Sequence, residues 1–165
     1  FSVGAGGFAQ FNNGQGATLN RVTGGEMSTI AGQLSATGSL YLINPAGVVV
    51  DGSGKVLTGG SFIASTRAVE MASFMAGGEL SFVGDSAGGI VNRGSIATGA
   101  DAVLIGRYVE NSGSIDAKGD ALLAAGTRVV LREASADSRI YVDGGSGDLT
   151  NSGDISGAAA ELRSA

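Results

Sequence analysis

The chain has 165 residues, of which 30 are glycine, with one proline and no cysteine, histidine or tryptophan. Collagen is excluded because there is no Gly-X-Y period, and a 43% hydrophobic, 15% charged composition disfavours disorder. Without histidine and cysteine, imidazole- and thiol-based catalysis is excluded, and no metal or cofactor site is predicted. The net charge of −5 argues against nucleic acid as a partner. The glycines therefore punctuate a chain that folds, and its length predicts a single domain over residues 1–165.

The apolar segments are short, β-branched and bounded by Gly, Asn, Asp and Ser, which is typical of strands. In chain order, the predicted strands cover residues 40–43, 48–50, 103–105, 129–131 and 140–142. No window has the i, i+3, i+4, i+7 spacing of an amphipathic helix, and only the alanines at 158–160 could add a terminal helical turn. The sequence therefore predicts an all-β fold.

The first two predicted strands are joined by Asn44-Pro45-Ala46-Gly47. A type I turn favours Asn at its first position, Pro at its second and Gly at its fourth. Proline also has no N–H to donate, which costs little in a turn. This segment is therefore predicted to be a structural β-turn between two strands.

A repeat runs through the second half of the chain. The pattern Asn-x-Gly-x-Ile starts at Asn92, Asn111 and Asn151, so the intervals are 19 and 40 residues. These intervals correspond to one and two periods of about 20 residues, a length typical of stacked repeat architectures. Residues 129–131 are predicted to lie in the intervening coil, which lacks the asparagine.

Strands this short at this period leave no room for crossover helices, so the sequence predicts a right-handed parallel β-helix, or β-solenoid. At about 20 residues per coil, the chain would form about eight coils stacked at the strand spacing of about 4.8 Å. The glycines would lie at the corners. Asn92, Asn111 and Asn151 are interpreted as structural corner residues whose amides stack between coils, with a row of ligand-binding amides as the alternative.

Other functions remain as alternatives. Some parallel β-helices degrade acidic polysaccharides, and paired carboxylates could come from Asp101, Asp116, Asp120, Asp137, Asp143, Asp148 and Asp154. Most of these residues lie beside Gly or Ser, where Asp is an ordinary turn former, so no catalytic residue is assigned. Asp143-Gly-Gly-Ser-Gly-Asp148 resembles a calcium-binding β-roll repeat, but it occurs once and is interpreted as a loop.

The exposed surface offers two further patterns. The arginines are spread along the chain and are expected to form solvated faces or to stack on neighbouring coils; they are Arg21, Arg67, Arg93, Arg107, Arg128, Arg132 and Arg139. A glycan-binding face could use Tyr41, Tyr108 and Tyr141, although they share no register.

An ordered series of segments resembles one known family. The series begins with residues 19–24, 30–34 and 40–50 and continues through 60–66, 74–77, 88–94, 105–106 and 124–126. It is similar to the two-partner-secretion (TPS), or haemagglutination-activity, domain of filamentous-haemagglutinin-like exoproteins of Gram-negative bacteria. The similarity spans roughly residues 1–131, and the family's fold is a right-handed parallel β-helix.

The resemblance implies a secretion-directing and fold-nucleating domain of a large adhesin-type exoprotein, with no enzymatic activity. Its partner would be the POTRA domains of an outer-membrane barrel transporter, and its destination the cell surface or the medium. Host receptors or glycans would be bound through the full-length protein. The recognition motif implied for the transporter comprises Asn20, Arg21, Asn44, Pro45, Ala46 and Gly47. The alternative is a structural or adhesive β-helix segment of a surface filament.

The sequence departs from the family pattern in two places. Ala46 stands where the family's Asn-Pro-Asn-Gly motif has its second asparagine. The family's domain also starts some tens of residues before a segment like Phe1-Ser-Val-Gly4, with a region that caps the first coil. We therefore expect a fragment of a longer exoprotein, with an exposed aliphatic stack and unpaired edge at its first coil.

Overall fold

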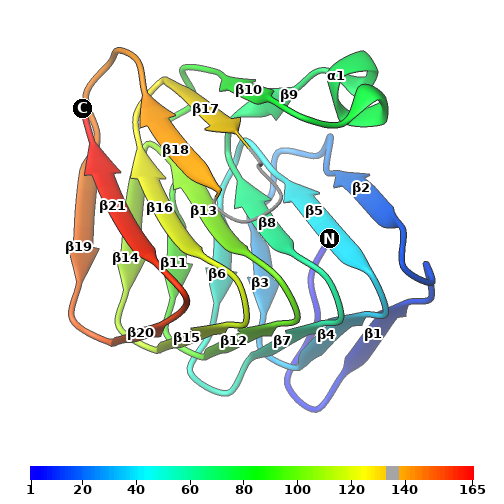
Figure 1. Cartoon of the computed structure of the whole chain (residues 1–165). Coiled ribbons are helices and arrows are strands. Elements are labelled where there is room, and N and C mark those ends of the chain that lie inside the picture. Colours follow the sequence, from blue (N-terminus) through cyan, green and yellow to red (C-terminus); the bar gives the residue numbers. More distant parts are fainter. Residues whose placement is uncertain (133–137) are drawn as a thin grey trace.

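The computed structural model describes residues 1–132 and 138–165, and its strands stack into a parallel β-solenoid with a smaller antiparallel sheet along one side (Figure 1). Sheet I contains β1 (Phe8–Phe11), β4 (Gln33–Ala36), β7 (Lys55–Thr58), β12 (Ser95–Thr98), β15 (Ser114–Ala117) and β20 (Asp154–Ser156). Sheet II contains β2 (Ala17–Arg21), β5 (Ser39–Ile43), β8 (Phe62–Ser65), β13 (Ala102–Gly106), β16 (Ala121–Ala125) and β21 (Ala160–Ser164). Sheet III contains β3 (Ser28–Ile30), β6 (Val48–Val50), β11 (Ile90–Asn92), β14 (Tyr108–Asn111) and β19 (Asp148–Asn151).

The interior of the solenoid is a set of stacked aliphatic columns. In sheet I, Ile96 pairs with Val56 on one side and with Ile115 on the other. In sheet II, Ala102 likewise pairs with Phe62 and Ala121. All these side chains are buried in one continuous core. The parallel β-solenoid predicted from the repeat is therefore confirmed.

The four inner strands of sheet II, β5, β8, β13 and β16, are buried on both faces, which explains why their sequences are almost continuously apolar. Their inward residues belong to the solenoid core, whereas their outward residues form a second core that includes Tyr41, Ile63, Val103 and Leu122. That second core is closed by side chains of the antiparallel sheet, among them Phe82 and Leu131. The antiparallel sheet therefore acts as a cover for sheet II.

The cover is built from two excursions of the chain. The first leaves after β8 and contributes β9 (Ala68–Val69) and β10 (Leu80–Val83); the second leaves after β16 and contributes β17 (Arg128–Arg132) and β18 (Arg139–Val142). The strand order β18-β17-β10-β9 joins the two excursions in one sheet. The prediction that residues 129–131 form part of a coil is therefore wrong.

The 40-residue interval in the asparagine pattern is one coil plus the second excursion, because β14 pairs directly with β19 and Asn111 with Asn151. Sheets I and II each contain six strands, so the described residues form six coils instead of the predicted eight. A period alone did not distinguish an extra coil from an excursion.

Helix α1 (Met71–Ala76), which the periodicity did not predict either, lies in the first excursion between β9 and β10. It ends at Gly77, and both Gly77 and Gly78 adopt positive φ angles of 70° and 84°. The helical turn considered for residues 158–160 is wrong, because Ala160 begins β21 and pairs with Ala121. Among the described residues, no helix has the length and apolar character needed to cross a membrane.

Arg67 ties the two excursions to the solenoid. It is fully buried, whereas the sequence predicted arginines that form solvated faces or stack on neighbouring coils. Its Nε donates to the Gly126 carbonyl at 2.7 Å, and its Nη1 donates to the carbonyl and hydroxyl of Ser86 at 2.7 and 2.9 Å. Burial lowers the pKa of Arg67, and Arg107 lowers it further, whereas Asp85 acts in the opposite direction. One side chain therefore links the start of the second excursion to the end of the first.

The three repeat asparagines form an amide ladder along one corner. The Asn92 Nδ2 donates to the Asn111 Oδ1, and the Asn111 Nδ2 to the Asn151 Oδ1, both at 2.8 Å. Asn92 and Asn111 are fully buried. The glycine of the motif is required for steric reasons, because a Cβ on Gly113 would lie 2.1 Å from the Gly94 carbonyl oxygen. The motif thus encodes both an inter-coil hydrogen bond and a close backbone approach.

Replacing Asn111 with alanine should lower the free energy of unfolding by about 1–3 kcal/mol, because the buried Asn92 amide loses its acceptor. Urea unfolding followed by circular dichroism measures this change. Ser112→Ala, at an exposed neighbouring position, serves as the control and should change stability by less than about 0.5 kcal/mol. Equal urea midpoints for the two variants would contradict a stabilising ladder.

Glu161 fastens the second excursion to β21. Its carboxylate accepts hydrogen bonds from Arg139 Nη1 at 2.7 Å and from the Ile140 N–H at 3.3 Å, and its side chain is 12% exposed. Burial acts to raise the pKa of Glu161, but the Arg139 and Ile140 hydrogen bonds, together with the nearby Arg163 and Arg139 charges, hold it below its usual value. The ionised form is therefore favoured by folding.

A carboxylate whose folded-state pKa is lowered stabilises the fold above its unfolded pKa, about 4.3 for Glu, and loses that contribution as pH falls through the folded value. Between about pH 6 and pH 3, we expect the wild-type urea midpoint to approach that of Glu161→Gln. Glu70→Gln, at an exposed position before α1, is the control. A constant gap between wild type and E161Q over this range would refute the role of the ionised carboxylate.

Candidate functional site

The turn Asn44–Gly47 is built around a buried asparagine. Asn44 is fully buried, and its Nδ2 donates to the Glu26 carbonyl at 3.0 Å and to the Ser28 hydroxyl at 2.9 Å. Its Oδ1 accepts the Ala46 N–H at 3.0 Å, and its carbonyl accepts the Gly47 N–H at 3.0 Å. Gly47 has a φ of 122°, which favours glycine. Asn44 therefore shapes the turn and holds the β2–β3 connection against it, while Pro45 is exposed.

Asn20 and Arg21 occupy the last two positions of β2, in the first coil. Their register partners are Leu42 and Ile43 of β5, so Asn20 stands in an inward column of sheet II and Arg21 in an outward one. The Arg21 Nη2 donates to the Val69 carbonyl of β9 at 2.6 Å. Arg21 thus joins the first coil to the edge strand of the antiparallel sheet, whereas Asn20 lies on the opposite face of the same strand.

A hollow of about 390 Å³ brings part of the predicted motif together. Arg21, Pro45 and Ala46 line it with the apolar Val22, Ile43 and Ala68. Asn20, Asn44 and Gly47 do not line this hollow, and Asn44 acts on it only through the turn. Ala68 comes from the first excursion, and the sequence offered no signal for it because its position depends on the fold of the insertion.

The aspartates considered for catalysis separate into two groups. Asp116, Asp143, Asp148 and Asp154 are exposed, and Asp137 lies outside the described residues. Asp101 and Asp120 converge on Ser138, whose hydroxyl donates to Asp101 Oδ2 at 2.6 Å and whose N–H donates to Asp120 Oδ2 at 2.9 Å. Asp101 Oδ1 also accepts the Asp120 N–H at 2.8 Å. These carboxylates fasten the second excursion to a coil corner.

The described residues contain no cluster of three acidic, histidine or cysteine side chains that could hold a metal ion. In the loop considered for calcium, Asp143 instead faces Arg128, with 3.8 Å between Oδ2 and Nε. Tyr41 is buried, whereas Tyr108 and Tyr141 are exposed, so the three tyrosines do not form one glycan-binding face. The Arg132 guanidinium instead lies 5.6 Å from the centre of the Tyr141 ring.

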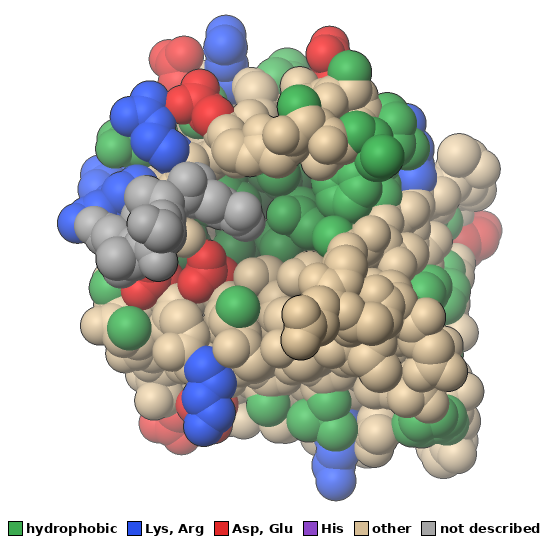
Figure 2. Space-filling view, turned by 45° about the vertical axis from the view of Figure 1, so that its right-hand side comes forward, with side chains coloured by type: hydrophobic (Ala, Val, Ile, Leu, Met, Phe, Trp, Pro, Cys, Tyr) green, Lys and Arg blue, Asp and Glu red, His purple; other side chains and the backbone are tan. Residues whose placement is uncertain are grey.

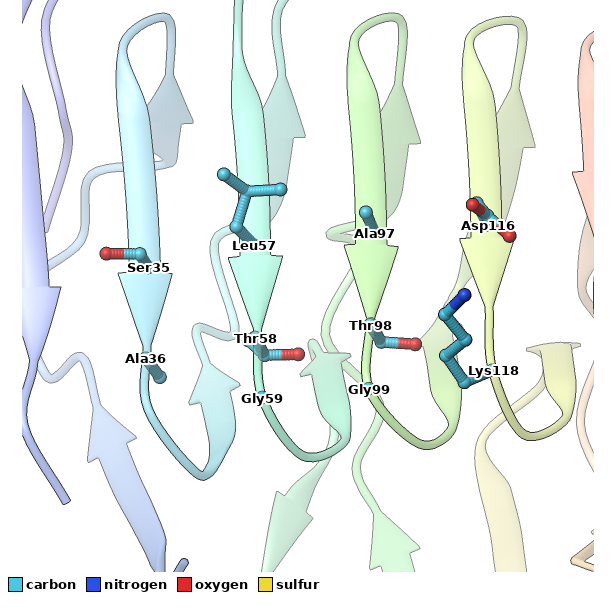
Figure 3. A pocket seen from close by; sticks show the side chains of 10 residues that line it. All are labelled: Ser35, Ala36, Leu57, Thr58, Gly59, Ala97, Thr98, Gly99, Asp116 and Lys118. Carbon is cyan, nitrogen blue, oxygen red and sulfur yellow. The ribbon is translucent and has the colours of Figure 1, made fainter. Parts of the chain in front are cut away.

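A second shallow hollow, of about 400 Å³, crosses β4, β7, β12 and β15 on the outer face of sheet I (Figure 3). Its threonines are engaged in their own turns, because Thr58 and Thr98 donate to the carbonyls of Gly60 and Ala100 at 2.8 Å. Asp116 and Lys118 stand at its β15 end (Figure 3). No base, nucleophile and oxyanion donors converge among these residues, so the hollow has no catalytic arrangement.

The chain is therefore a β-solenoid in which one sheet is covered by an antiparallel sheet. An Asn-Pro turn connects β5 to β6. The family model of the TPS secretion domain matches residues 1–163, and the chain belongs to this family. Domains of this family direct secretion through a cognate outer-membrane transporter. The resemblance inferred from the ordered segments is confirmed.

Two relatives from Haemophilus influenzae support this assignment. The crystal structure of the HMW1 secretion domain superposes with a TM-score of 0.82 at 29% identity, over 94% of this chain and 44% of that chain. A heme/hemopexin-binding protein is 36% identical over 106 residues, which are 59% of this chain and 12% of that protein. This chain therefore spans a small part of the latter relative.

Replacing Asn44 with alanine should destabilise the domain by about 1–3 kcal/mol, because the buried Ser28 hydroxyl and the partly buried Glu26 carbonyl both lose their donor. Ala46→Asn restores the family's second asparagine at a half-exposed position and should change the free energy of unfolding by less than about 0.5 kcal/mol. Chemical unfolding of both variants measures the difference. An Asn44→Ala domain as stable as the wild type would contradict the turn-shaping role.

Proposed function

We propose that this domain directs a large adhesin-type exoprotein to its cognate transporter by binding the transporter's periplasmic POTRA domains, and that it then nucleates folding at the cell surface. Membership of the TPS family, over residues 1–163, is the observation that carries this proposal. The proposed destination of the exoprotein is the cell surface or the medium.

The proposed recognition motif is the pair Asn20–Arg21 together with the turn Asn44–Gly47. Within this motif, the exposed and the buried side chains have different roles. Arg21 and Pro45 are exposed and available to a partner, whereas Asn44 is buried and fixes the turn from below. Ala46, which replaces the family's second asparagine, presents only a methyl group, so the contact proposed here does not need that amide.

A nucleating role is supported by the stacked columns and the amide ladder. Each coil presents unpaired backbone groups and an aliphatic column to the next one. At the last coil, Asn151 accepts from Asn111, while Leu162 stands 43% exposed in an inward column. These groups would template a following coil with the same pattern.

We infer no enzymatic role, because the described carboxylates are either exposed and scattered or engaged in structural hydrogen bonds. Heme binding, the property in the name of the Haemophilus relative, is not proposed for this domain, since the match covers only 12% of that protein. Receptors and glycans would be bound by other parts of a full-length exoprotein.

The decisive experiment measures export of the full exoprotein with Asn44→Ala in the domain. Export should fall, because the turn that presents Pro45 is lost. Asn111→Ala is the matched control, since it removes a buried asparagine of another corner at a similar expected cost in stability. Unchanged export of N44A through the cognate barrel would contradict the proposal, as would an equal loss in N111A.

The second candidate function is a structural or adhesive β-helix segment without a transporter-specific role. The exposed Leu57 on the outer face of sheet I favours it, because an exposed aliphatic side chain on a flat sheet face suits packing in a filament. Binding of the domain to purified POTRA domains separates the two, since a filament segment would not bind them.

A further inference from the structure

The amide ladder has a direction along the solenoid. Asn92 donates through Nδ2 to Asn111 Oδ1 at 2.8 Å and to the Ser114 carbonyl at 3.1 Å, and both acceptors belong to the following coil. The Asn111 Nδ2 in turn donates to Asn151 Oδ1 at 2.8 Å. Each asparagine therefore takes its acceptors from the coil that comes after it.

The ladder needs no amide in the coils that come before it. In the register of sheet III, Asn92 pairs with Val50, and Val50 pairs with Ile30. Val3 bridges Ile30, and all three aliphatic residues are buried. The Asn92 Oδ1 accepts the Gly94 N–H of its own coil at 3.2 Å. The same column is thus apolar at the first coils and polar at the last ones.

The two ends of the solenoid therefore differ in chemistry. Figure 2 shows the side of the molecule on which the first coils lie, and hydrophobic side chains gather there in a hollow below the antiparallel sheet. At the other end, Asn151 is exposed, and no described residue accepts a hydrogen bond from its Nδ2. Beside Asn151, the inward aliphatic columns end in Leu149, Ile155 and Leu162. A coil stacked here must match three aliphatic columns and one amide.

Stacking a coil on Asn151 removes water from its amide. A buried donor without an acceptor costs its full desolvation, which exceeds what a satisfied hydrogen bond contributes. Any coil offers a backbone carbonyl like that of Ser114, but only a side-chain carbonyl in the ladder column replaces the Oδ1 acceptor that Asn111 and Asn151 supply. The end of the solenoid therefore discriminates between coils by the residue at this one position.

We propose that Asn151 makes the C-terminal end of the solenoid a selective docking surface for the next coil of the exoprotein, and that this coil carries an amide acceptor in the ladder column. A second copy of the domain fits this end poorly, because its first coil would bring the side chain of Val3 to Asn151. This inference rests on the proposed nucleating role and names the residue that selects the coil to be templated.

The test extends the 165-residue domain by one coil, a copy of residues 108–126 appended directly after Ala165. The copied asparagine then lies as far behind β21 as Asn111 lies behind β13, and it faces Asn151. A matched extension has valine in place of the copied asparagine, a residue that the column already holds at Val50. Hydrogen–deuterium exchange with mass spectrometry measures the protection of the added coil, which should be about tenfold or more greater with asparagine than with valine.

Two further comparisons test the cause of this preference. A third extension has valine in place of the copied Ser112, an exposed position, and should be protected like the asparagine coil. In the domain variant Asn151→Val, the preference for asparagine should vanish or reverse, because no donor is left to be buried. The lost acceptor of Asn111 affects both extensions of N151V equally. Protection of β13 identifies variants that fold, and the three extensions of the unchanged domain decide the question if N151V does not.

Equal protection of the asparagine and valine coils on the unchanged domain would overturn the selectivity, and so would a preference that persists in N151V. Head-to-tail association of the unextended domain in sedimentation would also overturn it, since the Val3 side chain offers no acceptor. If neither coil gained protection, the nucleating role would fall as well. Binding to POTRA domains is measured separately, so its failure would contradict the recognition role and leave this inference standing.

Discussion

The stacking of coils is the constraint on which the rest of this structure depends. A single coil of about 20 residues cannot bury its own aliphatic side chains, so each one needs a neighbour in register. A shift by one residue would turn the inward column of Leu40, Phe62 and Ala102 to the outside. The amide ladder at Asn92, Asn111 and Asn151 and the close approach at Gly113 permit only one register. Aliphatic columns and corner residues therefore specify the same alignment.

Much of the solenoid could be predicted from the sequence because its signals are local and repeated. Asn-x-Gly-x-Ile marks a corner and a following strand wherever it occurs, and the Asn-Pro-Ala-Gly segment matches its turn position by position. The antiparallel cover could not be predicted, because residues 129–131 have the same β-branched composition whether they continue a coil or leave it. Whether this segment continues a coil or joins the cover is decided only by its pairing with β10, which lies about 50 residues earlier in the sequence.

The candidate site was predicted in part for the same reason. Arg21 and the turn are close to each other through the pairing of β2 with β5, and their motif is visible in the sequence. Ala68 reaches the hollow beside the turn through a non-repeated excursion with a short helix, for which neither period nor motif exists. The burial of Arg67 was not predicted. Its three hydrogen-bond acceptors come from residues distant in the sequence, and nothing near Arg67 in the sequence indicates them.

The shared construction of the cover has a consequence for the order in which the molecule can be completed. The outward residues of β5 and β8, such as Tyr41 and Ile63, are sealed by a sheet whose central pair joins Leu80 to Leu131. When the chain emerges with its N-terminus first, the outward side chains of β5 and β8 are therefore exposed until β17, which completes the cover, has also emerged. Long-range pairing of this kind slows folding because the loop must close before its contacts form. The domain thus reaches its final state as one unit, at the moment its last third arrives.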